Sequence, residues 1–230
     1  MTDDQAIPAA TVVLLRGAGR PELLMLKKNR GQAFGGNWVF PGGKVEDADV
    51  DAAGSGAAEV DVARHAAVRE ATEETGVVLP PGALVPFSHW VPPPGNGVKR
   101  FSTWFFVAEL PEGAAEVVID GGEIGDHVWT TPAGALERHA AGEIELAPPT
   151  WMSLTVMAEH ETAAAALAHA AASPVSFYAT RIGTLDGDIV TMWEGDAGYE
   201  SSDPTLAGAR RRVIMRPGGW IYERDGSNDG

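Results

Sequence analysis

The sequence predicts a protein of the mixed α and β class (α/β or α+β), with a β-rich segment at its C-terminal end. Two apolar runs rich in β-branched and aromatic residues, at 10–16 and 101–110, predict strands. Ala, Arg and Glu dominate residues 57–75, and this stretch predicts a long helix that ends at Gly76. From Pro174 onward the composition changes to short strand-like runs separated by Gly, Asp and Pro.

The N-terminal part is expected to form a β-hairpin. The strand at 10–16 is followed by a turn rich in Gly and Pro, and residues 22–28 provide the return strand. Residues 1–8 lack such a pattern, and we expect them to be disordered. Further strands are predicted at 84–91, 101–110 and 116–119.

The second half of the chain adds two helices and the β-rich tail. Thr131 is a suitable N-cap and Pro132 suits a first helical position, so a helix is predicted to begin there. A longer helix is expected from about 150 to 172, after an extended run that ends at two prolines. The tail is too short for an independent domain, so we expect it to pack on the main domain or at a dimer interface. Its dense basic cluster, 210–212, is interpreted as ion-pair partners for nearby acids.

Composition argues against several classes of protein. The chain has 230 residues, 44% of them hydrophobic, which suits one large globular domain. Its net charge of −15 argues against binding to nucleic acid polymers, which requires a basic surface. No apolar run approaches the ~20 residues of a membrane span. The absence of Cys fits the reducing cytoplasm, where we expect the protein to reside.

A cluster of acids lies near the end of the predicted long helix. Glu70, Glu73 and Glu74 are spaced i, i+3 and i+4, so their carboxylates share one helix face. Like charges at this spacing destabilise a helix by ~0.2–0.5 kcal/mol per pair, and a divalent cation between them removes that repulsion. Carboxylate oxygens suit Mg²⁺ or Mn²⁺. A solvated acidic face is the alternative interpretation. An apolar run ending at Gly42 and Gly43 predicts a strand and a glycine loop just upstream, an arrangement that can hold a metal and a pyrophosphate.

Residues 69–77 resemble the signature of the Nudix hydrolases, Gly-x5-Glu-x7-Arg-Glu-U-x-Glu-Glu-x-Gly-U, in which U is a bulky aliphatic residue. They match in register, with Ala71 as a small U, and Gly43 is similar to the opening glycine. Two departures concern Asp61, which stands eight positions before Arg69 where the signature has Glu. Seventeen residues, instead of five, separate Gly43 from Asp61, so about a dozen are inserted. We expect the insert, 47–60, to be a loop with room for a helical turn.

The resemblance implies a Nudix fold, a mixed β-sheet sandwiched between helices, over residues 9–173, with 174–230 as an extension packed on it. It implies that Mg²⁺ or Mn²⁺ is held by Glu70, Glu73, Glu74 and the backbone carbonyl of Gly43. It also implies roles for residues around these ligands. Arg69 would orient Glu70. The base would be Glu73 or Glu123, with Asp120 and Asp126 as alternatives to Glu123. Substrate would be bound by Arg30 and Lys44, with Lys27 and Lys28 as alternatives to Arg30.

The insertion and the Pro-Pro segment before a helix are similar to features of a Nudix subgroup that includes peroxisomal coenzyme A diphosphatases. This resemblance implies hydrolysis of a diphosphate bond, with coenzyme A, its thioesters, ADP-ribose-like compounds and dinucleoside polyphosphates all open as substrates. The main alternative is a Nudix-fold binding or regulatory module without activity. A third hypothesis is an acidic α/β protein whose helix matches the signature by chance. A homodimer is compatible with each.

Overall fold

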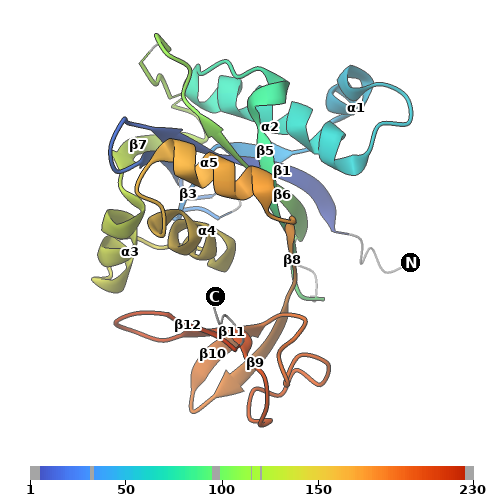
Figure 1. The fold of residues 1–230 in the computed structure, drawn as a ribbon, viewed down its shortest axis with the longest axis vertical. Coiled ribbons are helices and arrows are strands. Elements are labelled where there is room, and N and C mark those ends of the chain that lie inside the picture. The colour runs from blue at the N-terminus through green and yellow to red at the C-terminus, as the bar shows by residue number, and fades with distance from the viewer. Residues whose placement is uncertain (1–5, 32–33, 95–98, 115, 120, 226–230) are drawn as a thin grey trace.

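The computed structural model describes residues 6–31, 34–94, 99–114, 116–119 and 121–225. Within these residues, eight strands form one mixed sheet and four form a second, antiparallel sheet (Figure 1). The main sheet has the order β3-β2-β1-β6-β5-β8, with β4 paired to β1 and β7 paired to β2. Its strands are β1 (Ile7–Arg16), β2 (Glu22–Lys28), β3 (Trp38–Val39), β4 (Gly42–Lys44), β5 (Val85–Val91), β6 (Phe101–Glu109), β7 (Ile124–Thr130) and β8 (Ser176–Ala179).

The long strands agree with the sequence, but three expectations at short segments are wrong. Disorder was expected over 1–8, yet Ile7 and Pro8 belong to β1; residues 1–5 lie outside the described residues. The expected strand at 116–119 does not form, and Val118 only donates its N–H to the carbonyl of Thr75. The expected glycine loop at Gly42–Gly43 is instead the strand β4, paired antiparallel with β1.

Helices cover both faces of the main sheet. The alternation of side chains along β1 sends Val12 and Leu14 into one apolar cluster and Val13 and Leu15 into another. The first cluster packs against α2 (Glu59–Thr75), and the second packs against α4 (Pro148–Ala158) and α5 (Ala163–Ala172). This arrangement confirms a mixed sheet sandwiched between helices. No helix in the described ranges is long and apolar enough to cross a membrane.

The helices depart from the predictions at their ends. The expected single helix from 150 to 172 is two helices, because the chain leaves helical geometry after Ala158 and Thr162 caps a new start. The Thr162 hydroxyl accepts a hydrogen bond from the Ala165 N–H at 3.1 Å. The helix α3 (Pro132–Ala140) begins as predicted, with the Thr131 hydroxyl accepting from the Gly134 N–H.

The inserted segment contains more regular structure than expected. Residues Asp47–Ala53 form a helix, α1, rather than a loop with a helical turn. Glu46 precedes this helix, and its backbone N–H donates to the Asp49 carboxylate at 2.9 Å, as in a capping box. A short connection, 54–58, then leads to α2.

The C-terminal part forms the second sheet, whose strands are β9 (Arg181–Leu185), β10 (Asp188–Met192), β11 (Arg211–Met215) and β12 (Ile221–Arg224). The strand that precedes them, β8, belongs to the main sheet, where it pairs in parallel with β5. Aromatic rings join the two sheets: Trp90 of β5 stacks on Tyr178 at 4.1 Å and meets Trp193 edge-on at 5.5 Å. The segment after the predicted boundary at 173–174 therefore begins with a strand of the main sheet, and the division into domains stays a prediction.

A buried ion pair ties the segment between β10 and β11 to its sheet. Arg212 donates from Nε and Nη2 to the two oxygens of Asp196, at 2.7 and 2.6 Å. Asp196 also accepts from the backbone N–H groups of Gly198 and Arg211. The side chains of Arg212 and Asp196 are 1% and 0% exposed. The interpretation of the basic cluster as ion-pair partners is thus confirmed for Arg212.

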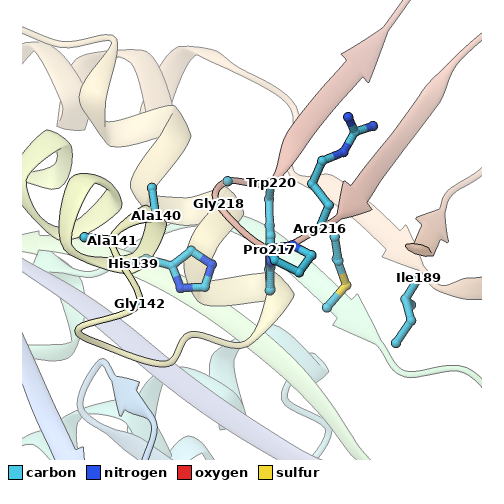
Figure 2. A pocket seen from close by; sticks show the side chains of 11 residues that line it. His139, Ala140, Ala141, Gly142, Ile189, Arg216, Pro217, Gly218 and Trp220 are labelled. Carbon is cyan, nitrogen blue, oxygen red and sulfur yellow. The ribbon is translucent and has the colours of Figure 1, made fainter. Parts of the chain in front are cut away.

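A hollow of about 450 Å³ lies between the end of α3 and the turn that joins β11 to β12 (Figure 2). His139 and Trp220 meet edge to face in its wall, with ring centroids 4.7 Å apart. None of its lining residues comes from α2 or from the glycine pair of β4. This hollow is therefore separate from the acidic cluster that the sequence singles out.

Candidate active site

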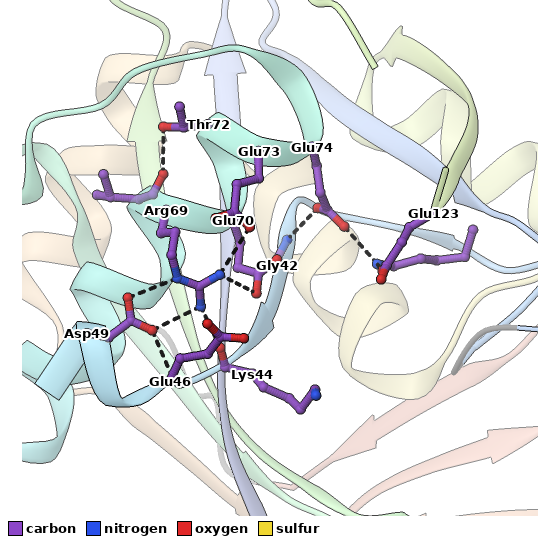
Figure 3. A network of polar contacts seen from close by, with 12 residues as sticks. Gly42, Lys44, Glu46, Asp49, Arg69, Glu70, Thr72, Glu73, Glu74 and Glu123 are labelled. Carbon is purple, nitrogen blue, oxygen red and sulfur yellow. Dashed lines mark hydrogen bonds and ion pairs between the residues drawn. The ribbon is translucent and has the colours of Figure 1, made fainter. Parts of the chain in front are cut away.

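The acidic residues project from the C-terminal half of α2. Small buried residues on the opposite side of this helix, among them Ala63, Ala67 and Ala71, let it lie close to the sheet. The helix ends at Gly76, whose φ of 71° is the left-handed conformation that glycine adopts without strain. The polar side chains of the last two turns consequently face β4 and α1, where they form the network in Figure 3.

The glycine pair lets β4 approach these side chains closely. A Cβ atom at Gly43 would lie 2.3 Å from Oε1 of Glu70, so only glycine leaves room for that carboxylate. At Gly42, a Cβ would lie 2.3 Å from the carbonyl oxygen of Ala10 on β1. The backbone N–H of Gly42 donates to Oε2 of Glu74 at 2.9 Å. Gly43 thus leaves room for the Glu70 carboxylate, and Gly42 holds the Glu74 carboxylate by a hydrogen bond.

Arg69 fixes the arrangement from the other side. It binds Asp49 through two parallel hydrogen bonds, from Nε to Oδ1 at 3.1 Å and from Nη2 to Oδ2 at 2.9 Å. Its Nη1 donates to Glu70 at 3.0 Å and to Glu73 at 3.2 Å. Its Nη2 also donates to the carbonyl of Lys44. The hydrogen bonds that Arg69 donates to Asp49, followed by the charge of Glu70, raise the pKa of Arg69 above its ordinary value.

The position of Asp49 corrects the placement of the insertion. Asp49 follows Gly43 after five residues, which is the spacing between the glycine and the first acid of the signature. The extra residues therefore lie between Asp49 and Arg69, and not between the glycine and the first acid of the signature. Asp61 itself lies in the first turn of α2 and pairs with Arg64.

Lys28, at the end of β2, joins two acids from different elements. Its ammonium lies 2.7 Å from Oε1 of Glu74 and 3.3 Å from Oε2 of Glu123, which immediately precedes β7. Asn29 holds the segment before β7, because its backbone N–H donates to the carbonyl of Glu123 and its side chain donates to Gly122. Burial lowers the pKa of Lys28, but the charges of Glu74 and Glu123 more than offset this effect and raise it.

Two of the acids are crowded and buried. Burial raises the pKa of Glu74, whose residue is 4% exposed, and the pairing with Lys28 only partly opposes this. Burial likewise raises the pKa of Glu70; Arg69 opposes the shift, and the neighbouring charges of Glu74 and Glu73 add to it. In this network two cations, Arg69 and Lys28, face five carboxylates, so negative charge is in excess; the five belong to Asp49, Glu70, Glu73, Glu74 and Glu123.

The predicted site residues do not all lie together. Glu70, Glu74 and the Gly43 backbone converge beside α2, and Glu123 is linked to them through Lys28. Glu73 reaches Arg69, but its side chain is 58% exposed. Two predicted substrate-binding residues, Arg30 and Lys44, are exposed, and the carbonyl of Lys44, rather than its side chain, takes part in the network.

Sequence reasoning missed Asp49 and did not choose Lys28. Counting forward from Gly43, instead of backward from Arg69, would have identified Asp49. The alternation of β2 would have identified Lys28, since it shares a strand face with Leu24 and Leu26, which pack against the α2 side of the sheet.

The donor set suits a hard divalent cation, although the acids are not gathered into a cage. Among the described residues, no group of three or more His, Asp or Glu side chains is placed so that it could hold a metal ion as it stands. The observations that favour a cation here are the carboxylate of Glu70 seated against Gly43 and the ammonium of Lys28 between Glu74 and Glu123. Oxygen ligands of this kind match Mg²⁺ or Mn²⁺.

Comparisons with known proteins bear on the family and the fold. The acyl-coenzyme A diphosphatase NUDT19 of Gallus gallus is 35% identical over 75 residues, which cover 31% of this chain and 20% of that relative. The crystal structure of a Nudix hydrolase from Alicyclobacillus acidocaldarius superimposes with a TM-score of 0.66 at 22% identity, covering 76% of this chain and 99% of that one. The model of the NUDIX domain family matches residues 6–149. The chain therefore belongs to the Nudix family and has the Nudix fold.

Proposed function

We propose that the protein is a Mg²⁺- or Mn²⁺-dependent pyrophosphohydrolase, which uses water to cleave the diphosphate bond of a nucleoside diphosphate linked to another moiety. The observation that carries this proposal is the Glu70 carboxylate seated against Gly43 in a family member that retains Arg69, Glu73 and Glu74. An inactive binding module would have no need to keep three acids in repulsive proximity on one helix.

Each residue of the network has a role in this proposal. Glu70, Glu73, Glu74 and the carbonyl of Gly43 would hold the cation, which supplies charge neutralisation at the phosphate oxygens and lowers the pKa of a bound water. Arg69 keeps Glu70 in place, and Asp49 keeps Arg69 in place by two hydrogen bonds.

A base is also needed, and two acids meet its requirements differently. Glu73 is open to solvent and contacts Arg69, whereas Glu123 lies across from α2 on the far side of Lys28. The base takes the proton from the attacking water while the diphosphate bond is cleaved. Both assignments belong to this proposal. Glu123→Gln distinguishes them, since loss of the base lowers kcat, whereas Glu73→Gln would also remove a metal ligand.

Coenzyme A or an acyl-coenzyme A is the substrate that the matched relative favours. NUDT19 is an acyl-coenzyme A diphosphatase by name, and the likeness covers 31% of this chain. The helix α1 belongs to the inserted segment and lies next to the site. Substrate specificity is commonly set by such insertions beside a site. The proposal also includes a location in the cytoplasm and a homodimeric state. Size-exclusion chromatography of the purified protein tests for the dimer.

The test is hydrolysis of a panel containing coenzyme A, acyl-coenzyme A, ADP-ribose and a dinucleoside polyphosphate, with Mg²⁺ or Mn²⁺. The wild type should release phosphorylated products, and Glu74→Gln should lower turnover by about two orders of magnitude or more, as expected for loss of a metal ligand. Glu112→Gln is a matched control, because it removes the same charge from an exposed turn. Equal turnover in wild type and Glu74→Gln would refute the site, and no hydrolysis of any compound would favour a binding module.

A further inference from the structure

The ammonium of Lys28 lies between Glu74 and Glu123, whose carboxylates could also bind a metal ion. It contacts Glu74 at 2.7 Å and Glu123 at 3.3 Å, and its side chain is 12% exposed. Glu74 belongs to α2, Glu123 precedes β7 and Lys28 ends β2, so three separate elements meet at this one positive charge.

The two acids do not need Lys28 to hold their positions. Glu74 is already fixed by the hydrogen bond from the Gly42 N–H to its Oε2. The backbone of Glu123 is already fixed by Asn29, and Gly125 lies so close to the Asn29 side chain that a Cβ there would be 2.3 Å from its Oδ1. Lys28 therefore contributes positive charge to the acids rather than their placement.

A divalent ion and a lysine ammonium cannot both lie at hydrogen-bonding distance on the same carboxylate oxygen without strong repulsion. Two positive charges a few Å apart in a partly buried site repel by about several kcal/mol. The flexible four-carbon stem of Lys28 lets the ammonium withdraw from Glu74, and the more exposed Glu123, at 57%, can keep it nearby.

We propose that Lys28 is a built-in competitor of the metal ion for Glu74: it neutralises this carboxylate in the metal-free protein and is displaced from it when the cation binds. The inference rests on the proposed function, since it concerns the same metal site. Through its charge, Lys28 then sets how tightly the metal is held. It also accounts for the lack of a ready cage in the described residues, because Glu74 is engaged by Lys28 and Glu70 by Arg69.

The experiment measures the dissociation constant of Mn²⁺ from the whole protein by electron paramagnetic resonance at pH 7.5, without substrate. Lys28→Met should bind Mn²⁺ about tenfold more tightly, because the competing charge is gone, and Lys28→Arg should stay within about threefold of wild type. Lys27→Met is the matched control: it removes the same charge one residue away, from an exposed side chain that faces Trp38 at 6.0 Å. It should leave the constant unchanged.

Thermal unfolding gives a second readout. Without metal, Lys28→Met should melt below wild type because the buried Glu74 carboxylate loses its opposite charge and keeps only the hydrogen bond from Gly42. Saturating Mn²⁺ should raise the melting temperature of Lys28→Met by more than that of wild type, in proportion to its tighter binding. A lysine that merely supports the fold would instead weaken metal binding when removed.

The outcomes separate this inference from the proposed function. If the wild type binds Mn²⁺ and hydrolyses a diphosphate, but Lys28→Met binds Mn²⁺ equally or more weakly, the role of Lys28 is refuted and the function stands. If Lys27→Met tightens binding as much as Lys28→Met, only net charge matters and the inference fails. If the wild type binds no Mn²⁺, both proposals fail.

Discussion

Arg69 and Arg212 each bind one aspartate through Nε and Nη2, yet the two pairs lie in different surroundings. The Arg212–Asp196 pair is 1% and 0% exposed, and the remaining bonds of Asp196 come from backbone N–H groups. The Arg69–Asp49 pair is 20% and 4% exposed, and Arg69 uses Nη1 to reach two further acids. The Arg212–Asp196 pair thus stabilises the C-terminal sheet, whereas the Arg69–Asp49 pair orients the carboxylates of the candidate site.

The difference teaches that the number of opposing charges, rather than the pair itself, separates a structural region from a candidate catalytic one. Around Asp196, hydrogen bonds from Arg212 and from the backbone outweigh burial and lower its pKa. Around Glu70 and Glu74, burial outweighs the cations and raises their pKa values. Excess negative charge at a site is typical of a place that accepts a cation.

The largest expected effect is on stability. Arg212→Met leaves Asp196 buried without its partner, and should lower the free energy of unfolding by about 3–5 kcal/mol. Arg69→Met should lower it by only about 1–2 kcal/mol, because solvent reaches the edge of that pair. Urea unfolding of both variants measures the contrast, and equal losses would mean that exposure does not distinguish the two pairs.

Activity should respond in the opposite order. Arg69→Met should lower turnover about a hundredfold, equivalent to about 2.7 kcal/mol, because Glu70 and Glu73 lose the donor that orients them. Arg212→Met should leave turnover per folded molecule unchanged, since Arg212 contacts only the C-terminal segment. Steady-state assays at a temperature where both variants are folded give the comparison. A hundredfold loss in Arg212→Met would show that the two regions are coupled.

The next prediction concerns which aspartate serves as the first acid of the signature. Asp49→Asn should lower turnover about tenfold, or about 1.4 kcal/mol, because Arg69 then binds Glu70 and Glu73 without a fixed anchor. Asp61→Asn should change turnover less than twofold, because Asp61 is half exposed and pairs with Arg64. The same diphosphate assay measures both, and the reverse ranking would restore Asp61 to the signature position.

The smallest effect is a pH dependence with opposite signs in the two regions. Glu70 has a raised pKa, so above the ordinary value of 4.5 the folded state binds more protons than the unfolded state, and stability falls as pH rises. Asp196 has a lowered pKa, so its contribution is present above 3.8 and is lost as pH falls through its folded pKa.

Glu70→Gln isolates the first of these effects. Without metal, the variant should match wild type near pH 4 and exceed its free energy of unfolding by a margin that grows as the pH rises above 4.5. Urea titrations at several pH values measure the difference, and Mn²⁺ should reverse it by stabilising only the wild type. A difference that does not change with pH would contradict the raised pKa.

Much of the fold follows from local patterns. The bounds of β2 were predicted to the residue because turn residues flank an apolar run, and α2 ends at Gly76 because glycine readily adopts the left-handed conformation. The break between α4 and α5 could not be seen, since residues 159–162 contain no Gly or Pro to mark it. The prolines 148 and 149 were taken to end an extended run, although the first turn of a helix tolerates proline.

The site was predicted less completely than the fold. The signature acids of α2 were identified because their spacing is local to one helix. Asp49 and Lys28 reach them from α1 and β2, and such contacts depend on how elements pack rather than on sequence spacing. Arg30 was preferred over Lys28 on the family resemblance, in which a basic residue of this region can lie near the substrate, but strand alternation directs Lys28 toward α2. Whether Arg30 and Lys44 bind substrate stays a prediction.

A final consequence follows from β8. Thr180 is the single residue between this edge strand and β9, and it is held by Val91 on one side and Trp193 on the other. There is no linker to act as a hinge, so the two sheets should behave as one mechanical unit. A truncation after Ala172 would remove β8 and leave the aromatic edge strand β5 unpaired on that side. An exposed edge strand of this kind promotes aggregation. The smallest well-behaved fragment of this protein therefore extends well past residue 149, where the family likeness ends.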